Sequence, residues 1–224
     1  MEPAKAKQRI SRLQIERTME KLRANRMQAQ YIETAEEVPS RVAALLHEGD
    51  TVAVGGSVTL EQTGVLAMLR AGKYRFLDRY APGLTPDETR KIFIDSFSAD
   101  VYLSSSNAVT MNGELYNVDG NSNRIAALCY GPRSVILVVG CQKIVPDLDA
   151  AAAYVKQRSA PANAVRLDGD TYCAHTGVCQ GLHGGEWTDG CRTDARICCN
   201  YLVSARQREP GRIKVLLVGE ELGY

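Results

Sequence analysis

Short apolar runs that end in clusters of glycine, serine or asparagine constrain this chain more than any other feature. One run, Thr51 to Val54, leads into Gly55-Gly56-Ser57, and another, Asp100 to Leu103, leads into Ser104-Ser105-Ser106-Asn107. Segments with helical periodicity lie between such runs, and this alternation favours a mostly parallel, doubly wound sheet. In such sheets, ligands bind beyond the carboxyl ends of the strands. We therefore expect a three-layer α/β protein with a polar ligand cleft.

The order of the expected elements supports this fold class. Asn112-Gly113 inside the alternating stretch 109–118 predicts a hairpin. Residues 3–31 contain no glycine and have apolar residues at helical spacing, which predicts one long amphipathic helix. We expect further helices at 35–46, 59–71, 85–96, 122–128 and 147–158, and strands at 51–54, 74–77, 100–103, 134–139 and 213–218. The chain then forms a single domain over 1–224, with an N-terminal helical extension at 1–48 and a cysteine-rich insertion at 169–200.

Composition narrows the class of protein. The chain has 224 residues, of which 45% are hydrophobic, and this is enough for a substantial core. Its net charge of +1 gives no basis for bulk nucleic-acid binding. No apolar run approaches the roughly 18 residues that a membrane span needs, and the start has no signal-peptide pattern. The sequence therefore predicts a cytoplasmic protein whose cysteines are mostly reduced.

The polar clusters supply the candidate ligand residues. In the first cluster, glycines allow a close backbone approach and positive φ, while Ser57 and Thr59 add hydroxyl groups. The third cluster, Asp119 to Arg124, adds Asp119 as a base or orienting group and Arg124 as a bidentate clamp for a carboxylate or phosphate. Ordinary turn and helix-cap chemistry is the alternative for all three clusters. The full candidate set is Gly55, Gly56, Ser57, Thr59, Asn107, Asp119, Gly120, Asn123 and Arg124.

Five of the seven cysteines fall within a short C-terminal stretch. Cys173, Cys179, Cys191 and the pair Cys198-Cys199 have spacings that match neither a ferredoxin run nor a zinc ribbon. Four thiolates are nevertheless enough for a [4Fe–4S] cluster or for zinc. The candidate ligands are Cys173, Cys179, Cys191 and Cys198, with His175 and His183 as substitutes and Cys199 as a rival to Cys198. Free cysteines in a loop are the alternative. Arg192 and Arg196 are expected to lower the pKa of nearby thiols. The other two cysteines, Cys129 and Cys141, flank expected buried strands and are expected in the core.

Three stretches together resemble the LUD-domain family of lactate-utilisation proteins. They read Gly55-Gly56-Ser57-x-Thr59-Leu60, Ala99-Asp100-x-Tyr102-x-Ser104-x-x-Asn107-Ala108-Val109-Thr110-x-x-Gly113 and Asn117-x-Asp119-Gly120-x-x-Asn123-Arg124-x-Ala126-Ala127. The resemblance implies a fold similar to that of sugar-phosphate isomerases and CoA transferases. It also implies a part in the oxidation of lactate to pyruvate, which in this family involves iron–sulfur proteins. The cysteine segment also resembles a pattern of shorter LUD proteins, with residues 180–190 as an insertion.

We therefore expect a protein of lactate utilisation that binds a small anionic metabolite and a metal centre, and that works with iron–sulfur or oxidoreductase partners. One alternative is a stand-alone enzyme acting on a sugar phosphate or CoA ester. The other is a non-catalytic subunit or regulator that docks through its N-terminal helix. The sequence identifies no catalytic residue and leaves a homo-oligomer open.

Overall fold

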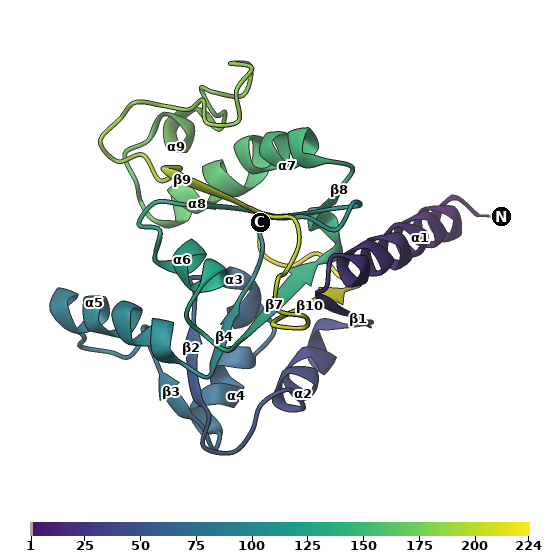
Figure 1. Cartoon of the computed structure of the whole chain (residues 1–224). Helices are drawn as coiled ribbons and strands as arrows, with labels where there is room; N and C mark the ends of the chain where they lie inside the picture. Colours follow the sequence, from purple (N-terminus) through teal and green to yellow (C-terminus); the bar gives the residue numbers. More distant parts are fainter. Residues whose placement is uncertain (1) are drawn as a thin grey trace.

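A six-stranded parallel sheet forms the centre of the computed structural model, which describes residues 2–224 (Figure 1). Its order is β1 (Gln28–Ile32), β10 (Ile213–Val218), β7 (Ser134–Gly140), β4 (Val101–Ser104), β2 (Thr51–Val54) and β3 (Arg75–Leu77). Every neighbouring pair is parallel. Residues 135–139 of β7 form a continuous apolar run, and β10 is apolar except for Lys214, because both faces of these strands are buried. The expected α/β class with a mostly parallel sheet is confirmed.

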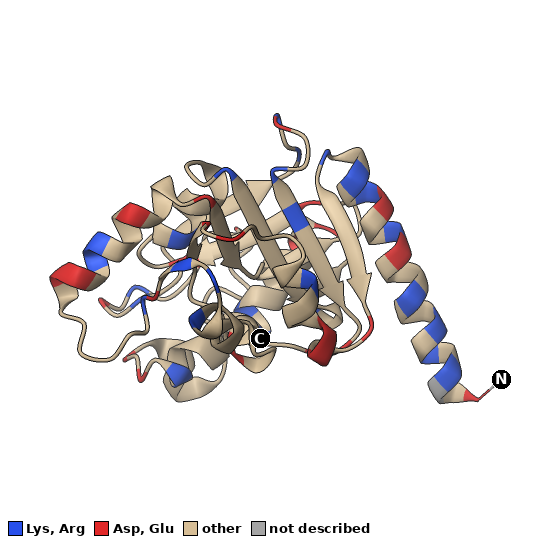
Figure 2. Ribbon diagram, turned by 90° about the horizontal axis from the view of Figure 1, so that it is seen from below, with Lys and Arg blue, Asp and Glu red and all other residues tan. Residues whose placement is uncertain are grey.

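Helices cover both faces of this sheet. α1 (Pro3–Ala24) and α6 (Asn123–Cys129) pack on one face, where Ile15, Leu22 and Leu128 join the core. α2 (Val38–Ala43), α3 (Val58–Gln62) and α4 (Val65–Ala71) pack on the other face. α5 (Pro86–Asp95) begins with a complete capping box between Thr85 and Glu88. Figure 2 shows the charged α1 extending along the outer edge of the sheet towards the N terminus.

A second, four-stranded sheet lies above the first and was not expected as a separate unit. Its order is β8 (Ile144–Val145), β5 (Ala108–Thr110), β6 (Leu115–Asp119) and β9 (Asn200–Ser204). β5 and β6 form the predicted hairpin, in which Gly113 has a φ of 80°. α7 (Leu148–Tyr154), a π-helical turn (Val155–Ser159) and α8 (Ala160–Arg166) continue one helical stretch that packs on this sheet. Together with α9 (Tyr172–Thr176), β9 gives regular structure to both ends of the cysteine-rich segment.

Several expected boundaries are wrong. The first helix ends at Ala24, because Arg26 takes a left-handed φ of 66° and residues 28–32 add a strand to the edge of the main sheet. The helix expected over 59–71 is broken by Gly64, which has a φ of 72°. The helix expected over 35–46 is a 3₁₀ turn followed by α2. Among residues 2–224, no helix is both long and apolar enough to cross a bilayer.

Candidate functional site

A polar cavity of about 480 Å³ opens beyond the carboxyl ends of β2, β4 and β6. The segments that follow these strands meet there, as expected. Eight predicted ligand residues line it: Gly56, Ser57, Thr59, Asn107, Asp119, Gly120, Asn123 and Arg124. The opposite wall consists of α8, the π-helical turn and residues 194–199 of the cysteine-rich segment. The cavity is therefore enclosed between the main sheet and the smaller sheet with its helices.

Gly55 and Ser57 shape the cavity without acting as the sequence suggested. Gly55 does not line it, and a Cβ atom there would lie 2.8 Å from Ser104 Oγ and 3.0 Å from Arg124 Cγ. Neither Gly55 nor Gly56 has a positive φ, and close packing requires a glycine only at position 55, because a Cβ atom on Gly56 would make ordinary contacts at 3.8 Å or more. Ser57 is the N-cap of α3, and its Oγ accepts a hydrogen bond from Leu60 N. The cap alternative thus applies to Ser57.

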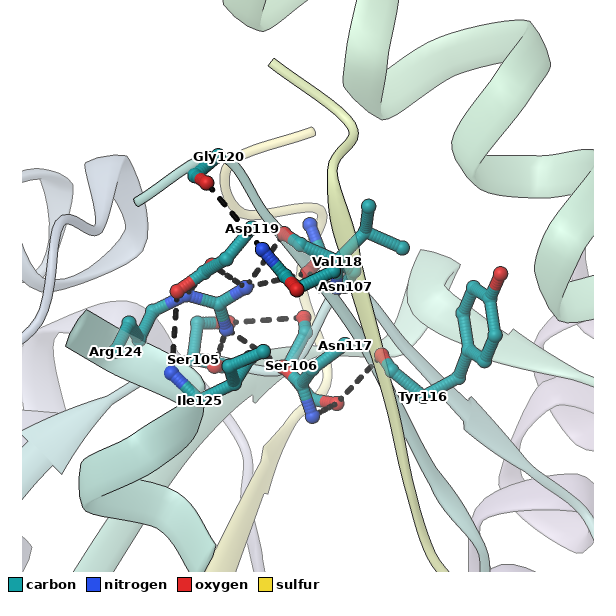
Figure 3. A network of polar contacts seen from close by, with 11 residues as sticks. Ser105, Ser106, Asn107, Tyr116, Asn117, Val118, Asp119, Gly120, Arg124 and Ile125 are labelled. Carbon is teal, nitrogen blue, oxygen red and sulfur yellow. Dashed lines mark hydrogen bonds and ion pairs between the residues drawn. The ribbon is translucent and has the colours of Figure 1, made fainter. Parts of the chain in front are cut away.

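Arg124 forms the centre of a buried network that joins the strand ends (Figure 3). Its Nε donates to Asp119 Oδ1 at 2.8 Å, and Nη1 donates to Asn117 Oδ1 at 2.6 Å. Nη1 also donates to the Ser105 carbonyl, and Nη2 donates to the Val118 carbonyl and to Asn107 Oδ1. All five guanidinium N–H groups therefore have acceptors inside the protein. The predicted bidentate clamp has no free donor in this arrangement.

The partners of Arg124 are occupied in turn. Asp119 Oδ2 accepts from Ile125 N, and Asn107 Oδ1 also accepts from Val118 N. Asn117 is fully buried and donates through Nδ2 to Ser106 Oγ. By contrast, Asn123 lines the cavity, and its side chain forms no hydrogen bond within residues 2–224. The network fixes the shape of the cavity floor and leaves ligand contacts to other groups.

Lys143 is a functional candidate that the sequence analysis did not identify. It ends the 3₁₀ turn Cys141–Lys143 that follows β7, lines the cavity and is only 4% exposed. Its Nζ lies 3.3 Å from Thr59 Oγ1 and 3.3 Å from Ser105 Oγ. No carboxylate lies within ion-pair distance among residues 2–224. Burial, and then the nearby Arg124 guanidinium, lower its pKa to about 8.

Arg79 is a second candidate that the sequence analysis missed. It follows β3, lines the same cavity and is partly exposed. Its guanidinium lies over the Phe93 ring at 4.4 Å and over the Tyr80 ring at 5.4 Å. Within the described chain it donates no hydrogen bond and forms no ion pair. Its N–H donors, which lie in the plane of the guanidinium, therefore remain available to a carboxylate or phosphate.

The cysteine segment forms a second, smaller cavity of about 20 Å³. Cys173, Cys179, Cys191 and Cys198 all line it, and Cys173 and Cys191 are buried. Cys199 does not line it and is exposed. The structure thus gathers the four predicted thiols and places Cys198, not Cys199, among them. His175 and His183 are exposed and do not line this cavity.

Burial has the largest effect on the acidity of the Cys198 thiol. Desolvation and the neighbouring cysteines raise the pKa of Cys198 to about 12. The charge of Arg196 lowers the pKa of Cys198, as expected for a nearby arginine, but burial outweighs this effect. Arg196 uses its donors on the carbonyls of Cys198, Cys191 and Thr188 and on Tyr201 Oη. Within residues 2–224, no three His, Cys, Asp or Glu side chains are arranged to hold one metal ion.

The two cavities share a wall. Both are lined by Val118, Val155, Ala160, Arg196, Ile197 and Cys198.

The prediction for the two remaining cysteines is wrong in part: Cys129, expected in the core, is exposed, while Cys141 is partly buried.

Comparisons with known proteins place this architecture in a family. The sequence model of the LUD domain matches residues 15–218. The fold is similar to the crystal structure of a DUF162 family protein from Deinococcus radiodurans, with a TM-score of 0.51 and 17% identity. That alignment covers 95% of this chain and 98% of the other. No curated protein sequence matches significantly. Since the match spans both sheets and all three strand-end clusters, the chain belongs to the LUD domain family.

Proposed function

We propose that this protein binds a small carboxylate or phosphate metabolite in the polar cavity, and that it does so as a component of lactate utilisation. The observation that carries the proposal is the buried amine of Lys143, which lines the cavity and has no carboxylate partner within residues 2–224. A buried cation without a counter-ion is costly unless an anion completes its surroundings. Membership of the LUD domain family supports the link to lactate.

Other groups around the cavity support an anionic ligand of metabolite size. Among the described residues, the Arg79 guanidinium and the Asn123 amide form no hydrogen bond or ion pair, so both offer free donors. Thr59 and Ser105 place hydroxyl groups beside the Lys143 amine. A volume of about 480 Å³ lies in the range of small-molecule sites. It also exceeds the needs of a three-carbon acid, so sugar phosphates and CoA esters belong in the same test.

Isothermal titration calorimetry with lactate, pyruvate, inorganic phosphate, ribose 5-phosphate and CoA tests the proposal. We expect saturable binding of lactate or pyruvate at one site per chain, and weaker binding in Arg79→Gln. Arg75→Gln is the matched control, because Arg75 lies on β3, shortly before Arg79 in the chain, but outside the cavity. Turnover of ribose 5-phosphate or a CoA ester would support the stand-alone enzyme instead. No binding of any of these anions would contradict the proposal.

We also propose that Cys173, Cys179, Cys191 and Cys198 hold a metal centre. The supporting observation is that all four line one cavity while Cys199 lies outside it. In a [4Fe–4S] cluster each thiolate binds a different iron, so the thiols lie farther apart than the ligands of a single ion. Four thiols lining one cavity suit either such a cluster or a zinc ion, and metal analysis distinguishes the two.

Metal and sulfide analysis of protein purified without oxygen tests this centre. We expect iron and acid-labile sulfide in equal amounts, with a visible absorption band, in the wild type and in Cys199→Ser. Cys198→Ser should lose both. Zinc without sulfide would replace the cluster with a structural ion, and metal-free protein with full ligand binding would remove the centre from the proposal.

A further inference from the structure

The Lys143 amine has unusual surroundings for a buried lysine. Its amine lies at the floor of the cavity, and both of its protein partners are hydroxyl groups, Thr59 Oγ1 and Ser105 Oγ. These partners are themselves buried, with 1% and 8% of their surface exposed. Hydroxyl groups solvate the amine weakly and do not lock it as an ammonium ion in the way that a carboxylate does. The amine is thus aimed into the cavity in a setting that admits its neutral form.

Lys156 and Lys214, the other lysines that are buried or half-buried, have surroundings that differ from those of Lys143. Lys156 donates to the carbonyls of Gly181 and Glu186 at 2.8 and 2.7 Å. Lys214 donates to Ser134 Oγ and to the Gly211 carbonyl. Each of these amines has at least one strong carbonyl acceptor and neither lines the large cavity. Lys143 lacks such an acceptor among residues 2–224.

We propose that Lys143 is a nucleophile that forms an imine with the carbonyl group of a small 2-oxo acid bound in the polar cavity. This inference rests on the proposed anion-binding function. Arg79 would hold the carboxylate of the acid, because its guanidinium is unpaired and lines the same cavity. A neutral amine is the reactive form of lysine towards carbonyl groups, and burial beside another cation is the usual way to obtain it.

The reaction balances without an added oxidant or reductant. The nitrogen lone pair attacks the carbonyl carbon, and the former carbonyl oxygen becomes a hydroxyl group. Loss of that hydroxyl group as water leaves the carbon–nitrogen double bond. Thr59 and Ser105 lie within hydrogen-bond distance of the amine and can relay the proton that the departing oxygen needs. No electrons leave the pair of reactants.

Burial and the Arg124 guanidinium keep the Lys143 pKa at about 8. The other charged groups that line the cavity are Arg79, Arg166, Arg196, Asp119 and Asp194, with Cys198, Cys199 and Tyr224 as further ionisable groups. Asp119 is already paired with Arg124. A substantial fraction of the amine is therefore neutral in mildly alkaline solution. The rate of imine formation should rise as the pH passes through this value.

Borohydride trapping with pyruvate as the probe tests the proposal. Reduction of the imine by hydride leaves a stable secondary amine, so the chain should gain the mass of pyruvic acid less one oxygen atom. Peptide mapping should place this mass on Lys143 and not on Lys156 or Lys214, which serve as internal controls. Labelling should saturate with pyruvate, and lactate should protect, because it has the carboxylate but no carbonyl. The variant Lys143→Met should lose the label while retaining the wild-type circular dichroism spectrum.

Two results would overturn the inference, and only the second would also overturn the proposed binding function. If pyruvate binds in calorimetry but no label forms, or if exposed lysines are labelled as readily as Lys143, imine formation is wrong and the proposed binding function stands. If neither pyruvate nor any other anion binds, both proposals fail.

Discussion

Arg124 and Lys143 are both buried and both line the polar cavity, yet their surroundings differ completely. Arg124 places all five of its N–H groups on protein acceptors, including the carboxylate of Asp119. Lys143 has two hydroxyl neighbours and no carboxylate among the described residues. The comparison teaches that a cation in a cavity wall is not automatically a ligand group. What separates a structural cation from a binding one is whether the fold has already supplied its acceptors.

The strongest test of the comparison is Arg124→Met. The change leaves Asp119, Asn117 and Asn107 without their shared donor in a buried setting, so we expect unfolding free energy to fall by about 3–5 kcal/mol. Arg70→Met is the control, because its ion pair with Asp78 is half exposed and should contribute less than about 1 kcal/mol. Urea denaturation measures both. Similar losses in the two variants would break the comparison.

For Lys143→Met we expect the free energy of unfolding to rise rather than fall. The folded protein holds the lysine pKa at about 8, below the ordinary 10.5, so the unfolded chain binds more protons between these values. Wild-type stability therefore rises with pH in that window. We expect the variant to be more stable than the wild type near neutral pH by about 1–3 kcal/mol, and the gain to fade by about pH 10.

The matched control for that prediction is Lys156→Met. Its amine satisfies two carbonyl groups, so this variant should lose stability at the same pH. Thermal unfolding across a pH series checks the pair. A stabilised Lys156→Met, or a destabilised Lys143→Met, would show that the two amines are not different in kind.

Arg79→Gln extends the comparison to a cation at the rim. Because Arg79 has no protein acceptor among residues 2–224, its loss should leave the unfolding free energy nearly unchanged. The affinity for a bound carboxylate should fall about tenfold, which corresponds to about 1.4 kcal/mol. Calorimetry on Arg79→Gln and Arg75→Gln separates the two effects. Equal affinity in both variants would remove Arg79 from the site.

The smallest expected effect concerns two hydroxyl groups. Ser106 Oγ donates to the Ala108 carbonyl and accepts from Asn117, so Ser106→Ala should cost about 1–2 kcal/mol. Ser104 Oγ is buried and has no hydrogen-bond partner within the described chain, so Ser104→Ala should change stability by less than about 0.5 kcal/mol. The denaturant midpoints of the two variants test whether a neutral group with hydrogen-bond partners also contributes more to stability than one without them.

The sequence predicted the position of the cavity better than it predicted which side chains have unsatisfied donors there. The clusters after β2, β4 and β6 were expected to meet because the carboxyl ends of parallel strands share one edge. Lys143 and Arg79 were missed even though each follows a strand of the same sheet, after β7 and β3. Each is a single cation outside the small polar clusters, so its position shortly after a strand is its sequence signal.

Other features lay beyond a single sequence. The role of Arg124 depends on acceptors from the β4–β5 connection and from β6, which only the tertiary fold brings together. The strand β1 reads as a continuation of α1 because its edge position is decided by pairing with β10, a partner far along the chain. The same holds for β9, whose pairing with β6 gives order to a segment that reads as a loop.

The wall common to the two cavities has a thermodynamic consequence. Val118, Val155, Ile197 and Cys198 face both spaces, so neither cavity can change shape through these residues without changing the other. An occupant of the thiol-lined cavity that displaces this wall alters the affinity of the polar cavity by some factor. Linkage then requires the occupant of the polar cavity to alter the first affinity by the same factor. Two chemically unlike sites would thereby share one coupling free energy.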